Sequence, residues 1–387
     1  MDKLYNSHII PIIYFCEKIT ERQFIPKKMK HYLLLMLAFA STVMCAQTPG
    51  EDVFIHPESI GGARQEVRIP NVDGYLTLKG DFHMHTVFSD GAVWPTFRVE
   101  EARKTGLDII AITDHIEVKR YSKWLSDKVD YNTSYQIAQE SAQDDIIVVP
   151  GTEITRSKPF GHMNALFISD ANKANTKKEL DALEAMLKQG AYILWNHPGW
   201  PDDISTMYPI HKELIAKGKI HGVEIWNDLE SYPVSYDWIQ EYGLHPFANS
   251  DIHATIGFKY AGIRPMTLVF AKEKSLESIK EAMFAGRMLA FFNNFLMGKE
   301  EYMKLLVPEC IDFEKLEDKG SYYRCRVKNN SDIKFTLQFG TTVHHVTVDP
   351  RSQVDVEVSK NQIITFVNCI LAKNKYFSIQ ESELCNK

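Results

Sequence analysis

The feature that most constrains the fold is a unit that recurs along the chain from about residue 76. In each copy a polar, helix-like stretch ends at a glycine, and an apolar, β-branched run follows closely. These glycines and runs are Gly106 before 107–113, Gly190 before 191–195, Gly218 before 220–226, Gly243 before 244–249 and Gly286 before 288–292. A glycine after a helix commonly takes the left-handed conformation, and runs that are apolar throughout suit parallel strands buried on both faces. The pattern predicts an α/β fold of repeated strand–helix units.

Polar side chains stand where these apolar runs end, and in one case where a run begins. They are Asp81, His83 and His85 after the first run, Thr113, Asp114 and His115 after the second, Glu153 after the third, His162 and Asn164 at the opening of the next, Asn196 and His197 after another, and Ser250, Asp251 and His253 after the last. In a (β/α) barrel the carboxyl ends of the strands meet at one mouth, where active sites lie. We therefore predict a barrel of about seven strands with its site at that mouth.

The character of the chain changes after residue 305. Short β-rich runs are separated there by turn-forming segments, at 322–327, 334–339, 344–348, 354–358 and 363–367. We predict an arm over 47–75, a barrel over 76–304 and a small all-β module over 305–387. The module shows no acid–base or metal-binding constellation.

The first 46 residues have the pattern of a leader. Lysines at 27, 28 and 30 precede an apolar run at 32–40 that is too short to span a bilayer, and small residues follow it. We predict a signal peptide over about 29–46, with 1–28 a gene-start artefact, and an exported chain that is periplasmic or extracellular. Met44 before Cys45 disfavours lipid anchoring, so no membrane attachment is expected after cleavage.

Loss of the leader changes the charge and the cysteine content of the chain. The whole chain has a net charge of −6, and removing six Lys and Arg with three Asp and Glu leaves −9. Binding to a phosphate backbone needs clustered positive charge, so stable nucleic-acid binding is not expected. Residues 47–305 contain no cysteine, so a metal there must be held by His, Asp or Glu. The pairing of Cys310, Cys325, Cys369 and Cys385 stays open between disulfides and buried thiols.

His83-x-His85 means little by itself, because this spacing arises readily by chance in a chain with 14 histidines. It is, however, one of two i, i+2 pairs at strand ends, the other being Asp251 and His253, and alternation along a strand directs both members of a pair to one face. Nine nitrogen or oxygen ligands then converge on one mouth, namely His83, His85, Asp90, His115, Glu153, His162, His197, Asp251 and His253. At three or four protein ligands per ion they would serve about two or three metal ions.

Together these motifs resemble the PHP (polymerase and histidinol phosphatase) superfamily of metal-dependent phosphoesterases. They stand in family order as Asp81-Phe82-His83-Met84-His85-Thr86 with Ser89-Asp90-Gly91, Thr113-Asp114-His115, Gly151-Thr152-Glu153, His162, Asn196-His197-Pro198 and Ser250-Asp251-Ile252-His253. The resemblance implies a distorted (β/α)7 TIM-like barrel that extends to about residue 300. It does not cover the C-terminal module.

The resemblance also implies three groups of ligands, with Glu153 bridging the first two. The groups are His83, His85, Glu153 and Asp251; Glu153, His162 and His197; and Asp90, His115 and His253. Many family members have histidine where Asp90 stands, so the third group is richer in oxygen here. Mixed imidazole and carboxylate ligands suit Zn or Mn, which we favour, and also Fe.

The chemistry expected of such a centre is hydrolysis by an acidified water, with charge on the phosphate oxygens taken up by the ions. No covalent nucleophile is needed, and the barrel contains neither a G-x-S-x-G elbow nor a Walker loop. We predict Glu153 and Asp251 as catalytic residues, with Arg156 holding a phosphate oxygen through its bidentate fork. Weaker candidates are Lys158, Lys259 and Arg264 for the phosphate, and Trp195, Trp200 and Trp226 for an apolar leaving-group pocket or for core packing.

The predicted function is thus an exported phosphoesterase acting on small phosphate esters. Residues 264–270 and 280–287, with the β module after them, are similar to exported bacterial PHP phosphodiesterases, which favours diesters. Three alternatives stay open: a phosphomonoesterase of the same superfamily, an amidohydrolase-type metal hydrolase, and a non-catalytic metal-containing binding module. Glu153 at the bridging position, where amidohydrolase-type barrels usually carry a lysine, disfavours the second. The oligomeric state is not indicated.

Overall fold

The computed structural model describes residues 65–125, 130–257 and 259–384. The predicted leader and the first part of the arm lie outside the described residues, as does Cys385. Within the described part of the chain, no helix is long and apolar enough to cross a membrane. The described part of the arm packs onto the barrel, because Val67, Ile69 and Val72 are buried in its core.

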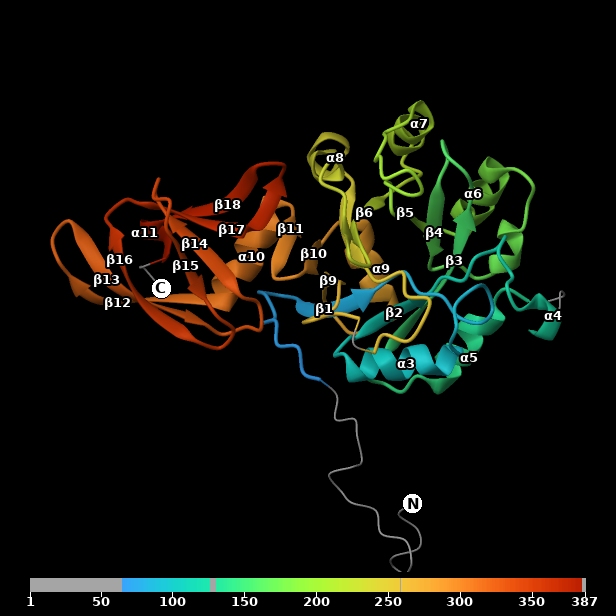
Figure 1. Cartoon of the computed structure of the whole chain (residues 1–387), viewed down its shortest axis with the longest axis horizontal. Coiled ribbons are helices and arrows are strands. Elements are labelled where there is room, and N and C mark those ends of the chain that lie inside the picture. The colour runs from blue at the N-terminus through green and yellow to red at the C-terminus, as the bar shows by residue number, and fades with distance from the viewer. Residues whose placement is uncertain (1–64, 126–129, 258, 385–387) are drawn as a thin grey trace, which may run out of the picture. The chain divides into compact units, whose positions relative to one another are not determined.

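A circuit of strands forms the barrel (Figure 1). In order around it they are β1 (Leu76–Asp81), β2 (Ile109–Ile112), β3 (Ile147–Thr155), β4 (His162–Leu166), β5 (Tyr192–Trp195), β6 (Gly222–Asn227) and β8 (His245–Asn249). β1, β2 and β3 are mutually parallel, as are β5, β6 and β8. The circuit closes where Met84, just beyond β1, bridges in parallel to Ile252, just beyond β8. The predicted α/β class and distorted barrel are thereby confirmed.

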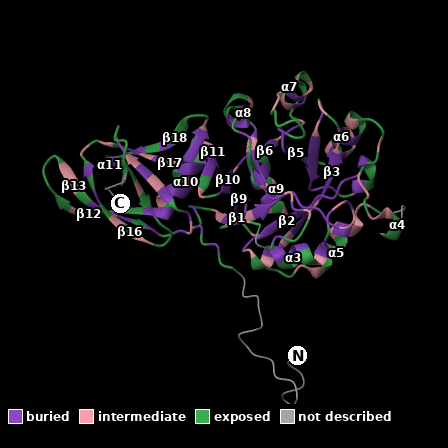
Figure 2. Ribbon diagram, viewed as in Figure 1, coloured by how far each residue is buried: buried purple, intermediate pink, exposed green. Residues whose placement is uncertain are grey.

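Helices lie between most of these strands along the chain. Part of the helical surface is exposed, whereas the strands are largely buried (Figure 2). They are α3 (Pro95–Lys104), α4 (Ser122–Leu125), α5 (Thr133–Ser141), the 3₁₀ helix η2 (Ala171–Ala174), α6 (Glu179–Leu187), α7 (Pro209–Ala216) and α8 (Ser235–Tyr242); α9 (Leu276–Phe284) comes after the last barrel strand. The five glycines predicted to end helices all have positive φ, between 66° and 78°. At Gly106 a Cβ atom would also lie 2.5 Å from the carbonyl oxygen of Gln65. Glycine is therefore required there by close approach as well as by conformation.

The prediction that the apolar runs form parallel strands is wrong for two of them, β4 and β10 (Met288–Phe292). β4 is antiparallel to both β3 and β5. β10 is antiparallel to β9 (Met266–Ala271), a further strand that is itself antiparallel to β1. For β4 the reason is the short connection 156–161, since a parallel crossover needs about a dozen residues or more. For β9 and β10, burial on both faces carries no information about strand direction.

The barrel sheet continues into the C-terminal module, which is β-rich as predicted. β10 forms a hairpin with β11 (Phe295–Gly298), and β11 pairs in parallel with β17. The module comprises β12 (Ile311–Asp318), β13 (Tyr322–Asn329), β14 (Phe335–Phe339), β15 (His345–Val348), β16 (Gln353–Ser359), β17 (Ile363–Ala372), β18 (Lys375–Gln380) and α11 (Glu381–Leu384). The predicted boundary at 304 falls inside α10 (Glu300–Cys310), whose residues Met303 and Leu306 share one core with module residues.

The described cysteines lie in this shared core. Cys310, Cys325 and Cys369 are fully buried, and Cys310 and Cys369 are free thiols. Burial raises the pKa of Cys310 to about 12 and that of Cys369 well above its usual value. Of the two possibilities left open by the sequence, buried thiols are the one found for Cys310 and Cys369.

Candidate metal centre

The two i, i+2 pairs extend from neighbouring parallel strands at the barrel mouth. His83 and His85 follow β1, Asp251 and His253 follow β8, and the backbone N–H of His85 donates to the carbonyl oxygen of Ile252 at 3.1 Å. The intervening residues Met84 and Ile252 are 1% exposed and pack in the core. Strand alternation therefore turns the four polar side chains toward the mouth, as the spacing predicted.

The structure brings all nine predicted ligands together. In each of three groups, one ligand atom per residue lies within 4.8 Å of those of the others: His83, His85 and Asp251; His83, Glu153 and His197; and His85, Asp90, His115 and His253. The ninth residue, His162, has Nδ1 2.9 Å from Glu153 Oε1. We call this set of nine residues the metal centre.

Glu153 stands at the middle of the centre, fully buried. Its Oε2 lies 3.3 Å from His83 Nε2 and 2.9 Å from His115 Nδ1, whereas its Oε1 faces His162 and His197 at 2.9 and 3.6 Å. Burial acts to raise the pKa of Glu153, but the imidazoles of His115 and His83 hold it well below its usual value. Its two oxygens thus face two different sets of ligands, which is the arrangement that a bridging carboxylate requires.

The carboxylates of the centre stabilise positive charge on the imidazoles beside them. Burial acts to lower the pKa of His115, but Glu153 and Asp90 raise it to about 9. The pKa of Asp251 is held well below its usual value by His83 and His85 despite its burial. Positive charge at this position, whether a proton or a metal ion, is therefore stabilised.

Several buried atoms of the centre have no hydrogen-bond partner among the described residues. They are both ring nitrogens of His85 and Oδ1 of Asp251; His85 Nε2 and Asp251 Oδ1 lie 2.9 Å apart, but not in hydrogen-bonding geometry. Buried polar atoms without a partner are costly and rare in folded proteins. These atoms belong to groups of converging ligands, and imidazole with carboxylate is a donor set that suits divalent transition metals. The residues present therefore fit the metal ions predicted from the sequence.

Two ligands have backbone conformations that are uncommon for their residue types. The φ angle is 21° at His197 and 48° at Asp251, so neither has the extended backbone of the strand before it. Such conformations cost about 1–3 kcal/mol and persist where the surrounding structure enforces them, often at functional sites. Here each marks the point where the chain leaves its strand and turns the ligand into the mouth.

Glu224 was missed by the sequence analysis although it supports the centre directly. It is fully buried on β6, with Oε1 2.8 Å from His83 Nδ1, and its Oε2 accepts from the backbone N–H of His197 and from Asn227 Nδ2, both at 2.8 Å. A carboxylate behind a ligand histidine orients the ring. The signal available was a lone glutamate within the apolar run 220–226.

Arg98 on α3 was also missed. Its buried guanidinium donates to the carbonyl oxygens of His85 and Ile252 at 2.9 Å and of Ala254 at 2.8 Å, and pairs with Glu101 at 2.7 Å. It thereby ties together the two loops that carry the i, i+2 pairs. An arginine on a helix gives no local signal of this role.

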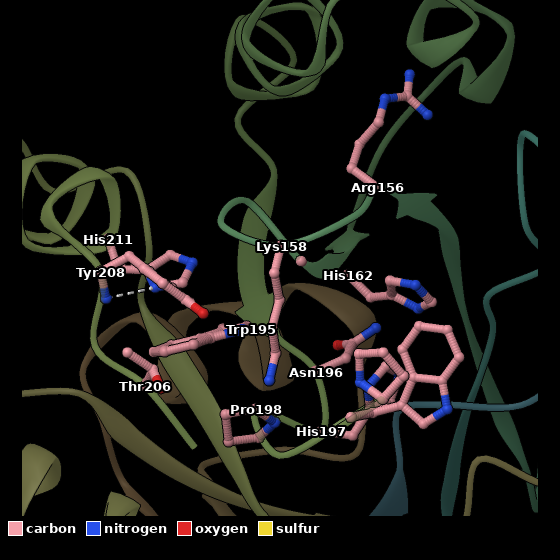
Figure 3. A pocket seen from close by; sticks show the side chains of 13 residues that line it. Arg156, Lys158, His162, Trp195, Asn196, His197, Pro198, Thr206, Tyr208 and His211 are labelled. Carbon is pink, nitrogen blue, oxygen red and sulfur yellow. Dashed lines mark hydrogen bonds between the residues drawn. The ribbon is translucent and has the colours of Figure 1, made fainter. Parts of the chain in front are cut away.

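Arg156, predicted to hold a phosphate oxygen, does not face the centre. It forms an ion pair with Glu117 and donates to the carbonyl oxygens of Thr155 and Thr176 at 2.9 Å. Figure 3 shows its guanidinium directed away from His162 and His197. The prediction is corrected, because nearby acceptors already engage this cation.

The other predicted phosphate-binding cations are also engaged. Arg264 is 3% exposed and pairs with Asp81 beneath the mouth, so it cannot reach a substrate. Lys158 pairs with Asp202 and donates to the carbonyl oxygen of Ile204. Lys259 lies 2.8 Å from Asp228 Oδ2 and lines the cleft described next.

A cleft of about 550 Å³ opens above the centre. Six of the nine ligands line it, together with Trp200, Tyr232, Asn227, Asp228, Glu230 and Lys259 among others. A second hollow of about 20 Å³, with room for about one water, is also lined by His162, His197 and Trp200 (Figure 3). Of the three tryptophans considered from sequence, Trp195 and Trp226 are buried in the core and only Trp200, at 52% exposure, faces the cleft.

Comparison with known proteins agrees with this geometry. The PHP domain family matches residues 81–177. The chain is similar to a solved structure from Bacteroides vulgatus ATCC 8482, that of a two-domain protein containing a predicted PHP-like metal-dependent phosphoesterase. The two are 35% identical, the match covers 83% of this chain and 99% of the Bacteroides vulgatus chain, and the TM-score is 0.78. The chain therefore belongs to the PHP-like metal-dependent phosphoesterase family.

More partial similarities add little about the substrate. An uncharacterised protein of Methanocaldococcus jannaschii is 42% identical over 85 residues, which are 21% of this chain and 36% of that protein. The lesion-specific endonuclease of Pyrococcus furiosus is 14% identical, with 58% of this chain and 59% of that chain covered and a TM-score of 0.40. A similarity this low does not bear on nucleic-acid binding, so its expected absence here stays a prediction.

Proposed function

We propose that the chain is an exported phosphoesterase that hydrolyses small phosphodiesters at the metal centre, with two or three Zn or Mn ions as cofactors. The observation that carries the proposal is the convergence of nine imidazole and carboxylate side chains at one barrel mouth, beneath an open cleft. The chemistry that such ions supply when bound is acidification of a water and uptake of charge from phosphate oxygens.

The protein residues have distinct tasks in this reaction. His83, His85 and Asp251 would hold one ion, and Glu153 with His197 and His162 another. The side chains of Asp90 and His253 remain 26% and 40% exposed. The ligand group to which they belong, with His85 and His115, is therefore the one nearest to an incoming ester. Asn227 Nδ2, 3.3 Å from Asp251 Oδ2, helps to orient that carboxylate.

The charge of the cleft supports a diester as substrate. Among the described residues that line it, Lys259 is the only lysine or arginine, and Asp228 already pairs with it. A monoester dianion gains from a free cation beyond the metal ions, as arginine and lysine commonly provide for phosphate. A diester carries a single negative charge and does not need one.

The test is the rate on bis(p-nitrophenyl) phosphate against p-nitrophenyl phosphate, with protein beginning at Gln47 and loaded separately with Zn or Mn. A clear preference for the diester is expected. A preference for the monoester would replace the proposal with a phosphatase, and no turnover of either by metal-loaded protein would reject phosphoester hydrolysis. Export is tested separately, by mass spectrometry of the protein recovered outside the cytoplasm, where an N-terminus at Gln47 is expected.

A further inference from the structure

Trp200 holds an indole ring directly beside two ligands of the metal centre. Its ring centroid lies 4.9 Å from that of His162 and 6.0 Å from that of His197. The backbone N–H of Trp200 donates to the carbonyl oxygen of His197 at 3.0 Å, so a tight turn connects the ring to the ligand. The ring therefore lies next to the centre at which a phosphate ester would react.

The turn that carries Trp200 packs against Tyr232, which also lines the cleft. A Cβ atom at Gly199 would lie 2.9 Å from Cε1 of Tyr232, so the Tyr232 ring contacts the backbone there. Tyr232 is 6% exposed and donates to Glu230 Oε2 at 2.6 Å. Despite this support Trp200 keeps 52% of its surface exposed, and it lines the cleft. A braced aromatic ring that leaves its surface free can stack on a flat ligand.

The walls of the cleft also restrict the charge of that ligand. Lys259 is paired with Asp228 at 2.8 Å, Asp228 further accepts from the Tyr260 hydroxyl at 3.1 Å, and Glu230 adds a second carboxylate. No unpaired lysine or arginine lines the cleft within the described residues. A second phosphate or another anionic group would meet net negative walls, whereas an uncharged ring would not.

We propose that Trp200 is the stacking platform for a flat, uncharged aromatic ring carried on the phosphate, so that the substrate class is aromatic phosphodiesters. The inference rests on the proposed phosphodiesterase function, which it makes more specific. Trp200 is a specificity-determining residue in this scheme and takes no part in bond cleavage.

Two anions without a scissile ester bond test the platform by binding alone. Diphenylphosphinate and dimethylphosphinate carry the same single charge and differ in their rings. Calorimetry with metal-loaded protein is expected to show that the diphenyl anion binds at least about tenfold more tightly, the size of effect that stacking produces. That preference should be lost in Trp200→Ala and kept in Trp200→Phe, with bound metal measured in each.

Trp124→Ala is the matched control, because Trp124 is 77% exposed and does not line the cleft. It should keep the preference for the rings. Hydrolysis of diesters with a ring preference that survives Trp200→Ala would overturn the platform and leave the proposed function intact. A ring preference that depends on Trp200 in a protein that hydrolyses no phosphoester would overturn the proposed function and leave the platform.

Discussion

Glu224 Oε1 lies 2.8 Å from Nδ1 of His83, and both side chains are fully buried. A carboxylate at Nδ1 favours the tautomer with the proton on that nitrogen, which leaves Nε2 to face Glu153 and Asp251 at 3.3 and 3.2 Å. The ring of His83 is thus oriented by a residue that belongs to none of the three groups of converging ligands.

Glu224→Gln should therefore weaken metal binding without removing a ligand. Changes of this kind typically cost about 10–100-fold in metal affinity or activity. Competition with a chromophoric chelator measures the affinity. Glu213→Gln on the surface of α7, where Glu213 pairs with Lys217 just beyond the helix, is the control and should bind metal normally. An unchanged affinity in Glu224→Gln would show that the carboxylate does not orient the ligand.

Substitution of a ligand should have a larger effect than substitution of its support. His83→Ala and Asp251→Ala should each lower bound metal and reduce turnover by more than about 100-fold, the upper range for supporting residues. His221→Ala should do neither, because His221 accepts from the backbone N–H of Ile193 away from the centre. Elemental analysis and the diesterase assay are the measurements. Equal losses in all three variants would contradict the assignment of the ligands.

Arg98→Lys should damage both stability and the centre. A lysine cannot make the planar set of donations to His85, Ile252, Ala254 and Glu101, so buried acceptors lose partners. Each buried acceptor left without a partner costs about 1–3 kcal/mol, which urea unfolding measures. Arg103→Lys on the same helix is the matched control, since Arg103 is partly exposed and should cost under about 1 kcal/mol. Similar losses of unfolding free energy in the two variants would show that Arg98 does not hold the two loops together.

Acid should destabilise the fold through two histidines below the mouth. Burial lowers the pKa of His221 to about 4, and burial with Lys299 and His221 lowers that of His245 to about 4. Unfolded histidine binds a proton near pH 6.5, so the stability they contribute is present above pH 6.5 and is lost as pH falls toward 4. The slope is about 1.4 kcal/mol per pH unit for each histidine.

Urea unfolding of metal-free protein between pH 7 and pH 5 measures this slope. His245→Gln should reduce the slope of the unfolding free energy against pH by about the contribution of one histidine. The comparison is between variant and wild type, so titration of the centre cancels. Identical slopes would show that His245 is not a source of the acid sensitivity.

The buried thiols should be detectable without reduction. Because Cys310 and Cys369 are free and buried, an alkylating reagent should label neither of them in folded protein and both after denaturation. Mass spectrometry of peptides identifies the labelled sites. Absence of label on Cys310 or Cys369 after denaturation would indicate a disulfide instead.

The ligands were accessible from sequence because their positions follow local rules. Strand alternation places His83 and His85 on one face, and the carboxyl ends of parallel strands meet at one mouth, so residues that end strands converge. Glycines after helices and apolar runs likewise identified the elements in order. Such patterns depend only on residues close to one another in the chain.

What only the tertiary structure decided is which distant group each charged side chain meets. Arg264 pairs with Asp81 across 183 residues, and Glu224 supports His83 across 141. The partner of a buried charge depends on which strands become neighbours, as does the direction of β9 and β10. For the same reason Arg156 was misassigned, and the pairing of β11 with β17, which joins the module to the barrel, could not be predicted. Local pattern determines burial and periodicity, whereas long-range packing determines partners.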